Sequence, residues 1–332
     1  MNLTETVRAV IAEKGTGILA PWIGSEHTKK EILAVLMAGR NLLLEGPPGV
    51  GKTLLAKSIA GSLPDIKACD CSFNCDPQHA DCPQCKAAVV KKNVITIAGP
   101  MRFVRVQGSP ELGAEDLIGD IDPVLAMKYG AFDARAYKPG RLVRANRQIL
   151  FVDEVNRMSE KIQNTLLQVL QEGEMTIGNF DVNFMIDTIF ISTMNESDVA
   201  GIETLSEALK DRIERITIPY PSEEDELVIL ERYGKSVVAV PNEIKRKIVS
   251  VSQRTRDDGE LEFPASARST LAVYELSQSF AKLRNSDEVN DEDVGSAIQL
   301  AFSGRLSPSV DSDYFDNMGS YINKLKQTIA DD

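Results

Sequence analysis

Short apolar runs bounded by polar residues predict buried strands in the first two thirds of the chain. Such runs occupy Asn41 to Leu44, Ile149 to Val152 and Thr188 to Ser192. Apolar residues in a continuous run, rather than in alternation with polar ones, are typical of strands buried on both faces. Between the last two runs, Gln163 to Gln171 has helical spacing and Glu174 to Asp187 alternates loosely, which predicts a helix and then a β-hairpin.

The last third of the chain keeps helical spacing but contains no strand-like runs. Ser222 is suited to cap the first of these helices, Asn242 begins a second, and Asn290 caps the last one. Polar residues of this kind accept hydrogen bonds from the free N–H groups at a helix start. The pattern predicts a smaller helical domain over 222–305 and a tail over 306–332.

Composition narrows the range of partners. The chain has 332 residues, 43% hydrophobic and 26% charged, which is enough for two domains with buried cores. The formal net charge of −12 disfavours nucleic acid as a general partner. We expect a cytoplasmic protein with no membrane segment, because the N-terminus lacks signal-peptide features and no apolar run approaches the ~20 residues of a membrane span.

A phosphate-binding motif follows the first apolar run. Gly46 and, four residues later, Gly51-Lys52-Thr53 fit G-x-x-x-x-G-K-[ST], and Leu54 to Ala60 has the pattern of a helix. Backbone N–H groups at such a helix start bind phosphates, while Lys52 meets the β and γ oxygens of ATP and Thr53 binds Mg²⁺. The expected ATP-binding residues are Gly46, Pro47, Pro48, Gly49, Val50, Gly51, Lys52, Thr53 and Leu54.

An acidic pair ends the second apolar run. Asp153 and Glu154 follow Ile149 to Val152 directly. A carboxylate at a strand end beside a phosphate loop holds Mg²⁺, so Asp153 is the expected metal-binding residue together with Thr53. Glu154 is then placed to orient and deprotonate the attacking water.

From this point the sequence resembles a known family. The segment "FVDEVNRM" and residues Lys161 to Asn195 look like the AAA+ ATPases of the MoxR and magnesium-chelatase clade. The resemblance runs from about Ile23 to about Arg305 and departs from the family at one cysteine-rich stretch. It implies an α/β fold in which an AAA+ P-loop αβα ATPase core over 1–221 is followed by a helical lid.

The resemblance also implies roles for four polar residues. Asn195 matches the position called sensor 1, which contacts the γ-phosphate or the attacking water. Arg212 matches the arginine finger, which acts in the ATP site of a neighbouring subunit, and Arg215 is the alternative. Arg268, at the start of a lid helix, matches sensor 2 and is expected to reach the γ-phosphate. A guanidinium in either position can neutralise charge that develops on the transferred phosphoryl group.

What the ATPase acts on follows from the resemblance alone. It implies a homo-oligomer, most often a hexameric ring, that remodels a partner protein or assists metal-centre assembly together with a von Willebrand factor A domain protein. A motor subunit of a magnesium or cobalt chelatase and a DNA-linked loader or helicase-like ATPase are the alternatives. Tyr129 and Phe132, in the family's helix-2 insertion region, are candidates for substrate contact or for local packing.

All five cysteines of the chain lie between Cys69 and Cys85. Such clustering in a cytosolic chain favours a metal site over disulfides, and two of the pairs have zinc-like spacing. An iron–sulfur cluster and reduced cysteines in a disordered insert remain alternatives. Cys69 is left over, and His79 can replace one thiolate. The predicted Zn²⁺ ligands, with a structural or docking role, are Cys71, Cys75, Cys82 and Cys85.

Overall fold

A computed structural model describes the chain in five stretches, residues 1–86, 93–133, 135–177, 182–195 and 205–331. Two compact units emerge. The first comprises Met1–Gly46 and Gly51–Ile218, and the second comprises Pro47–Val50 and Pro219–Asp332. No helix among the described residues is both long enough and apolar enough to cross a bilayer.

The first unit is built on a five-stranded parallel sheet with the order β11–β1–β10–β7–β4. The strands are β1 Asn41–Glu45, β4 Phe103–Gln107, β7 Gln148–Asp153, β10 Thr188–Met194 and β11 Ile213–Thr217. The three predicted strands lie side by side at the centre of this sheet. Their apolar runs are continuous because helices cover both faces of a parallel sheet.

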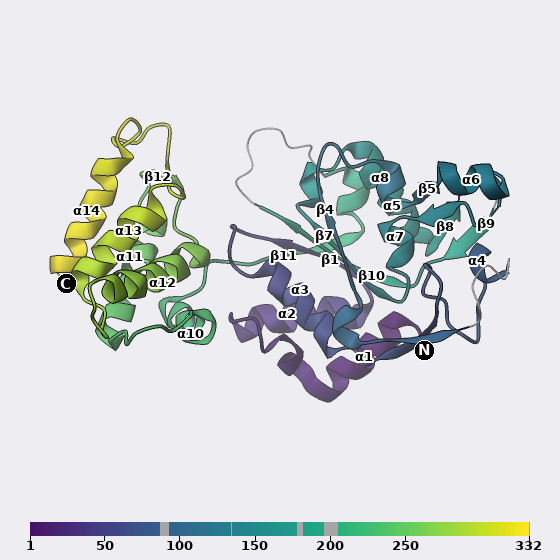
Figure 1. The fold of residues 1–332 in the computed structure, drawn as a ribbon, viewed down its shortest axis with the longest axis horizontal. Coiled ribbons are helices and arrows are strands. Elements are labelled where there is room, and N and C mark those ends of the chain that lie inside the picture. The colour runs from purple at the N-terminus through teal and green to yellow at the C-terminus, as the bar shows by residue number, and fades with distance from the viewer. Residues whose placement is uncertain (87–92, 134, 178–181, 196–204, 332) are drawn as a thin grey trace. The chain divides into compact units, whose positions relative to one another are not determined.

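Helices cover the sheet on its two sides. Figure 1 shows α1 Leu3–Lys14, α2 Glu26–Ala38 and α3 Lys52–Ser62 on one side, and α5 Ala114–Leu117, α7 Arg141–Arg144 and α8 Glu160–Glu172 on the other. Ser25 caps α2 by accepting a hydrogen bond from the Thr28 N–H. The remaining helices of this unit are α4 Pro83–Lys86, α6 Pro123–Tyr129 and α9 Glu207–Lys210, with 3₁₀ turns at Gly15–Leu19, Gly99–Met101 and Val155–Arg157.

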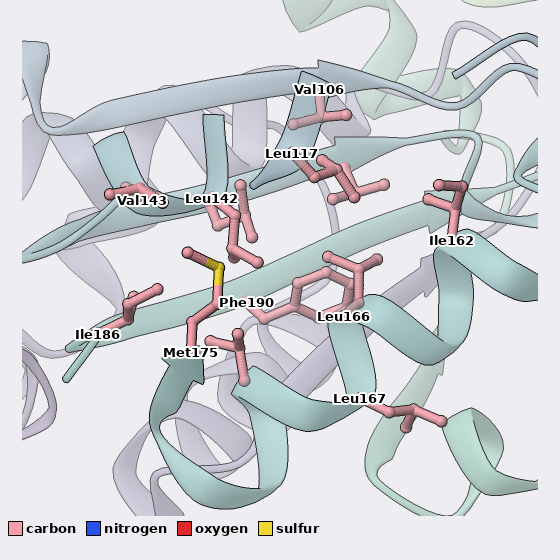
Figure 2. Close-up of a cluster of buried hydrophobic side chains, with 14 of the residues drawn as sticks. Val106, Leu117, Leu142, Val143, Ile162, Leu166, Leu167, Met175, Ile186 and Phe190 are labelled. Atoms are coloured by element: carbon pink, nitrogen blue, oxygen red, sulfur yellow. The ribbon is translucent and has the colours of Figure 1, made fainter. Parts of the chain in front are cut away.

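Three antiparallel strand pairs extend this unit beyond the sheet. They are β2 Ile66–Cys69 with β3 Val94–Ile97, β5 Gly119–Ile121 with β6 Tyr137–Pro139, and β8 Glu174–Ile177 with β9 Val182–Met185. The last pair is the predicted hairpin, although its expected turn at Gly178-Asn179 lies outside the described residues. Figure 2 shows Met175 of this hairpin in one buried cluster with Leu166 of α8 and Phe190 of β10.

The second unit is mainly helical. Its helices are α10 Glu223–Tyr233, α11 Asn242–Asp257, α12 Ala267–Leu283, α13 Asp291–Phe302 and α14 Met318–Asp331, and its short strands are β12 Leu261–Phe263 and β13 Ser307–Pro308. Ser222 and Asn290 cap α10 and α13 through the Asp225 and Asp293 N–H groups, as their residue types predict. Inside the unit, the fully buried carboxylate of Glu226 pairs with Arg256 at 2.8 Å.

The segment that the sequence sets apart as a tail contributes to the core of this helical unit. Tyr321, Ile322, Leu325 and Ile329 of α14 are all buried and belong to the same cluster as Phe302 of α13. Burial of an apolar side chain of this size contributes roughly 1.5–3 kcal/mol. The helical spacing at the end of the chain therefore reflects packing on the chain's own lid.

Candidate functional site

The topology brings the predicted ATPase residues to one edge of the sheet. Strands β1, β10 and β7 are neighbours and run parallel, so their carboxyl ends share an edge. The phosphate loop follows β1, Asn195 follows β10, and Asp153 and Glu154 end β7. Ligands of open α/β sheets bind at this edge, because the loops and helix N-termini converge there.

The phosphate loop depends on glycine at its two ends. Gly46 has φ +155°, and a Cβ there would lie 2.2 Å from the Ile218 carbonyl oxygen. Gly51 has φ +89°, and a Cβ there would lie 2.9 Å from the Trp22 ring. Neither position tolerates a side chain, because the backbone is left-handed or the space is filled. Helix α3 begins at Lys52, so its free N–H groups face the loop.

Lys52 is held inside this loop by hydrogen bonds to the protein. Its side chain is buried, and Nζ donates hydrogen bonds to the Gly46 carbonyl oxygen at 2.5 Å and to Oδ1 of Asn195 at 3.0 Å. The contact places the predicted sensor residue within reach of the phosphate-binding lysine. An anionic phosphate is a stronger acceptor than these two neutral oxygens, so it can displace them from the ammonium group.

Asp153 is oriented by two residues that the sequence did not single out. Its Oδ1 accepts a hydrogen bond from Thr193 Oγ1 at 2.6 Å, and its Oδ2 pairs with Arg105 Nη2 at 2.5 Å. Thr193 belongs to β10 and Arg105 to β4, on either side of β7. Mg²⁺ prefers carboxylate and hydroxyl oxygens, so Asp153 and Thr53 have suitable chemistry for the ion.

Glu154 has an unusual backbone and a restrained carboxylate. Its φ of 54° is left-handed, a strained conformation for a residue with a side chain. The Glu154 N–H donates to Thr193 Oγ1 at 3.0 Å, which helps to hold that conformation. Its Oε2 accepts from Gln107 Nε2 at 2.9 Å and from Arg157 Nη1 at 3.1 Å. In this structure the expected general base is therefore occupied by protein donors.

The two arginines considered as fingers have different surroundings. Arg212 follows α9, where Nη1 donates to the Ala208 carbonyl oxygen at 2.9 Å and to Asp211 at 3.3 Å, and the guanidinium lies against the Gln171 side-chain amide. Arg215 lies in β11 and forms an ion pair with the buried carboxylate of Glu45. That pairing gives Arg215 a structural role within its own chain.

The other sequence candidates lie in the helical unit or at and just after the end of α6. Arg268 is in the first turn of α12, after its cap Ser266, in the second unit. Phe132, beyond α6, is exposed, whereas the Tyr129 ring lies under the Arg135 guanidinium at 4.0 Å. Local packing therefore explains Tyr129 in part, and Phe132 is left as the exposed apolar residue of the two.

A second group of chemically reactive side chains lies in residues Cys69–Cys85, here named the metal loop. The Sγ atoms of Cys71, Cys75, Cys82 and Cys85 all lie within 4.8 Å of one another. Zn–S bonds of ~2.3 Å in a tetrahedron require sulfur atoms just under 4 Å apart, so this arrangement is close to that of a Zn(Cys)₄ site. The Cys85 N–H donates to Cys82 Sγ at 3.3 Å, which stabilises a thiolate there.

Proximity alters the acidity of these thiols. The pKa of Cys71 falls to about 2, because Cys75 and then Cys82 donate hydrogen bonds to its sulfur. The pKa of Cys75 rises to about 11 because its thiol donates to Cys71, and that of Cys82 rises for the same reason. One thiolate is stable in such a cluster, but four require a cation at the centre.

The structure separates the other two candidate ligands from this group. Cys69 is buried, and its thiol faces the Asp76 carbonyl oxygen at 3.9 Å. His79 is exposed, and its backbone N–H bonds to the same carbonyl oxygen. Among the described residues, the set that fits a metal ion is thus the four predicted cysteines, without Cys69 or His79.

Three family profiles match consecutive parts of the chain. The profile described as "Magnesium chelatase, subunit ChlI" matches residues 19–79, and "ATPase family associated with various cellular activities (AAA)" matches 79–214. The profile "MCM AAA-lid domain" matches 233–303. The boundary between the second and third profiles falls close to the boundary between the two structural units.

Named proteins are similar over most of the chain. A magnesium-chelatase subunit ChlI homolog from Methanocaldococcus jannaschii is 26% identical over 92% of this chain and 90% of its own length. Chaperone MoxR1 from Mycobacterium tuberculosis is 25% identical over 93% of this chain and 78% of its own length. A cryo-EM-based structure of the BchI–BchD complex of magnesium chelatase shares the fold, with a TM-score of 0.50, 21% identity and coverage of 87% and 97%.

The fold, the phosphate loop and these similarities all indicate the same class of protein. The chain is an AAA+ ATPase with an αβα core and a helical lid. Within that class it is of the MoxR and magnesium-chelatase type, as the sequence predicts. Members of this class bind ATP with Mg²⁺ and hydrolyse it.

Proposed function

We propose that the chain is the motor subunit of a homo-oligomeric ring that uses ATP hydrolysis to remodel a partner protein or to assist metal-centre assembly.

 This proposal rests on the positions of the site residues, which are divided between one edge of the sheet and the segment after α9. Lys52, Asn195 and the acid pair meet at one sheet edge, whereas Arg212 contacts Ala208, Asp211 and Gln171 of its own chain. A half-exposed arginine after α9 is suited to reach a neighbouring subunit's ATP.

The proposed mechanism assigns one task to each residue. The N–H groups of the loop and Lys52 bind the phosphates, and Thr53 and Asp153 would hold Mg²⁺, which would offset the negative charge of the phosphates. Glu154 orients and deprotonates water once it leaves Gln107 and Arg157. Asn195 and Arg268 contact the γ-phosphate. Arg212 of the adjacent subunit stabilises the charge that develops during transfer.

The partner is proposed from the relatives. MoxR1 bears the name chaperone, and BchI is found with a second subunit, BchD. We therefore propose a separate partner, a protein with a von Willebrand factor A domain, that carries the client to the ring. A hexamer is the proposed ring size. The second candidate function, the motor subunit of a magnesium or cobalt chelatase, is favoured by similarity to the ChlI homolog over 92% of the chain.

We also propose that the four thiolates of the metal loop hold Zn²⁺ as a resident structural ion. The donor set supports it, because zinc accepts four thiolates and the sulfur atoms already lie within 4.8 Å of one another. Its test is the zinc content of the purified chain, measured by emission spectroscopy. One zinc per chain is expected, and near-zero zinc in both the wild type and a Cys82→Ser, Cys85→Ser variant would remove the site.

Mixed rings test the shared active site. Arg212→Ala and Glu154→Gln should each abolish turnover alone, and mixing them should restore part of it, because some interfaces then pair an intact arginine with an intact acid pair. Lys210→Ala, two residues from the finger, is the matched control and should keep wild-type activity. Full activity in a dilute, strictly monomeric preparation would rule out the ring motor.

Pull-down separates the two candidate functions. The full-length Glu154→Gln variant, in which turnover is slowed, is loaded with ATP. It should retain a von Willebrand factor A domain protein if the chain remodels proteins. ATP-dependent insertion of Mg²⁺ or Co²⁺ into a tetrapyrrole, in the presence of a large porphyrin-binding subunit, would support the chelatase instead.

A further inference from the structure

The metal loop contributes an aromatic side chain to the core of the ATPase unit. Phe73 lies between the ligands Cys71 and Cys75 and is fully buried. Its ring contacts Phe184 of β9 edge-on, with centroids 5.0 Å apart, and lies 6.0 Å from the Tyr137 ring of β6. One residue of the loop therefore packs against two of the three antiparallel strand pairs that extend the unit beyond its sheet.

Hydrogen bonds attach the same part of the loop to the segment before β7. The Phe73 carbonyl oxygen accepts from Asn146 Nδ2 at 2.9 Å, and Asn74 Nδ2 donates to the Arg144 carbonyl oxygen at 2.7 Å. Asn146 also reaches the segment before β10, since its Oδ1 accepts from the Asp187 N–H at 3.0 Å. The two bonds of Asn146 are buried or half-buried, where a lost partner is costly, whereas the bond between Asn74 and Arg144 is exposed.

Arg147 makes a second connection between these segments. Its Nη1 donates to the Lys67 carbonyl oxygen of β2 at 2.9 Å, and its Nη2 lies 3.5 Å from the Asp76 carboxylate of the metal loop. The Arg147 N–H donates to the Asp187 carbonyl oxygen at 2.6 Å. The metal loop thus contacts, directly or through one residue, the entry points of both β7 and β10.

These two strands carry the ATPase residues at their other ends. Strand β7 begins right after Arg147 and ends in Asp153, and β10 begins right after Asp187 and leads to Asn195. The β8–β9 hairpin, against which Phe73 packs, connects α8 to β10. A shift of the metal loop would therefore act on the hairpin and on both strands from the side opposite to the nucleotide.

The metal loop has little regular secondary structure, and short-range hydrogen bonds hold its turns. Its only helix in the described part is the single turn α4, and its cysteines supply most of its buried side chains. These cysteines belong to the same buried cluster as Phe73, and a bound ion would add ligand–metal bonds to that packing. Phe73 lies between Cys71 and Cys75, so its position along the chain is tied to that of two of the four clustered thiols.

We propose that the metal loop is a zinc-dependent brace, which seats Phe73 and thereby holds the β8–β9 hairpin against the core of the ATPase unit. This inference rests on the proposed zinc site. Metal binding then controls how firmly the hairpin is held. When zinc is removed, the β8–β9 hairpin is the part of this unit that loses its support. Phe73 is a positioning residue and touches neither nucleotide nor metal.

Hydrogen exchange of the full-length chain tests the brace. We expect removal of zinc with a chelator to raise the exchange rates of the β8 and β9 amides at least tenfold, while the amides of β12 and β13 in the other unit stay unchanged. Phe73→Ala should give the same acceleration with one zinc still bound. Cys69→Ser, which changes a buried thiol outside the ligand group, is the matched control and should leave zinc content and exchange unaltered.

The outcomes distinguish the two proposals. Unchanged hairpin exchange after chelation, in a chain that contained zinc, overturns the brace and leaves the zinc site standing. A wild-type chain without zinc overturns the metal site and the brace together. If Phe73→Ala does not fold, chelation of the wild-type chain alone decides the matter. Loss of protection throughout the first unit, rather than in the hairpin, also counts against a local brace.

Discussion

The nucleotide edge of the sheet and the metal loop both gather charged or reactive groups, but different forces assemble them. At the edge, neighbouring parallel strands bring Lys52, Asn195 and Asp153 together, and protein hydrogen bonds satisfy them without a ligand. In the metal loop, four thiols lie within 4.8 Å of one another with little secondary structure around them. The fold preorganises the first site, whereas the proposed zinc site would depend on its ion.

This difference predicts different consequences of mutation. A substitution at the sheet edge should lower the ATPase activity and leave the fold intact, because backbone hydrogen bonds of the sheet stabilise the structure there. A substitution of a thiol ligand should remove structure first, because ion binding and local folding are one event.

The largest effect is expected at the acid pair. Glu154→Gln removes the proposed base and should lower the ATPase rate by about 10²- to 10⁴-fold, while ATP binding and the melting temperature stay close to wild type. Steady-state turnover and nucleotide titration measure the two quantities. Glu172→Gln, at the exposed end of α8, is the control and should change neither. Weak ATP binding by Glu154→Gln would contradict a purely chemical role.

Loss of a thiol ligand should affect stability instead. Cys82→Ser removes a fully buried thiol of the proposed zinc site and should release zinc and lower the melting temperature by roughly 5–10 °C, the equivalent of a few kcal/mol in a unit of this size. Calorimetry and metal analysis of the same samples provide the measurement. A variant that loses zinc and keeps the wild-type melting curve would place the metal loop outside the folded core.

Thr193→Val tests whether the sheet edge is truly preorganised. The substitution keeps the shape but removes the hydroxyl that binds Asp153 Oδ1 and the Glu154 N–H. We expect a 10- to 100-fold loss of Mg²⁺-dependent turnover, as for other residues that orient a metal ligand. Thr188→Val, at the opposite end of the same strand, is the matched control. Equal losses in both variants would indicate a general weakening of β10.

The smallest effect is expected at the thiol that the metal group leaves out. Cys69→Ser replaces a buried sulfur whose described contact is with the Asp76 carbonyl oxygen. We expect a change below about 1 kcal/mol in the free energy of unfolding, which denaturant titration measures, and no change in zinc content. A variant that lost its zinc would make Cys69 a fifth member of the site.

Much of the nucleotide edge was predictable, because its residues stand in short contiguous motifs beside strongly apolar runs. The phosphate loop, the acid pair and Asn195 each follow a run that proved to be a central strand. Arg105, Gln107 and Thr193 were not found, although they contact the acid pair. They lie within strands and carry no motif, so their role depends on strand order, which the local pattern does not contain.

The helical unit also shows that local features are predictable from the sequence and tertiary contacts are not. The caps Ser222 and Asn290 were predicted because a cap is a local feature of three or four residues. The place of α14 was not, since its apolar face could cover the chain's own lid or a neighbour, and only the packed cluster with Phe302 decides between them.

By itself, the sequence determined which residues match a phosphate-binding motif and which thiols have the spacing of metal ligands, because both depend on neighbours along the chain. Only the tertiary structure decided that Phe73 lies against Phe184 and that Asn146 links the metal loop to the entry of β10. Those contacts join residues about 40 to more than 100 positions apart, and their energies arise from burial and hydrogen-bond geometry that exist once the chain has folded.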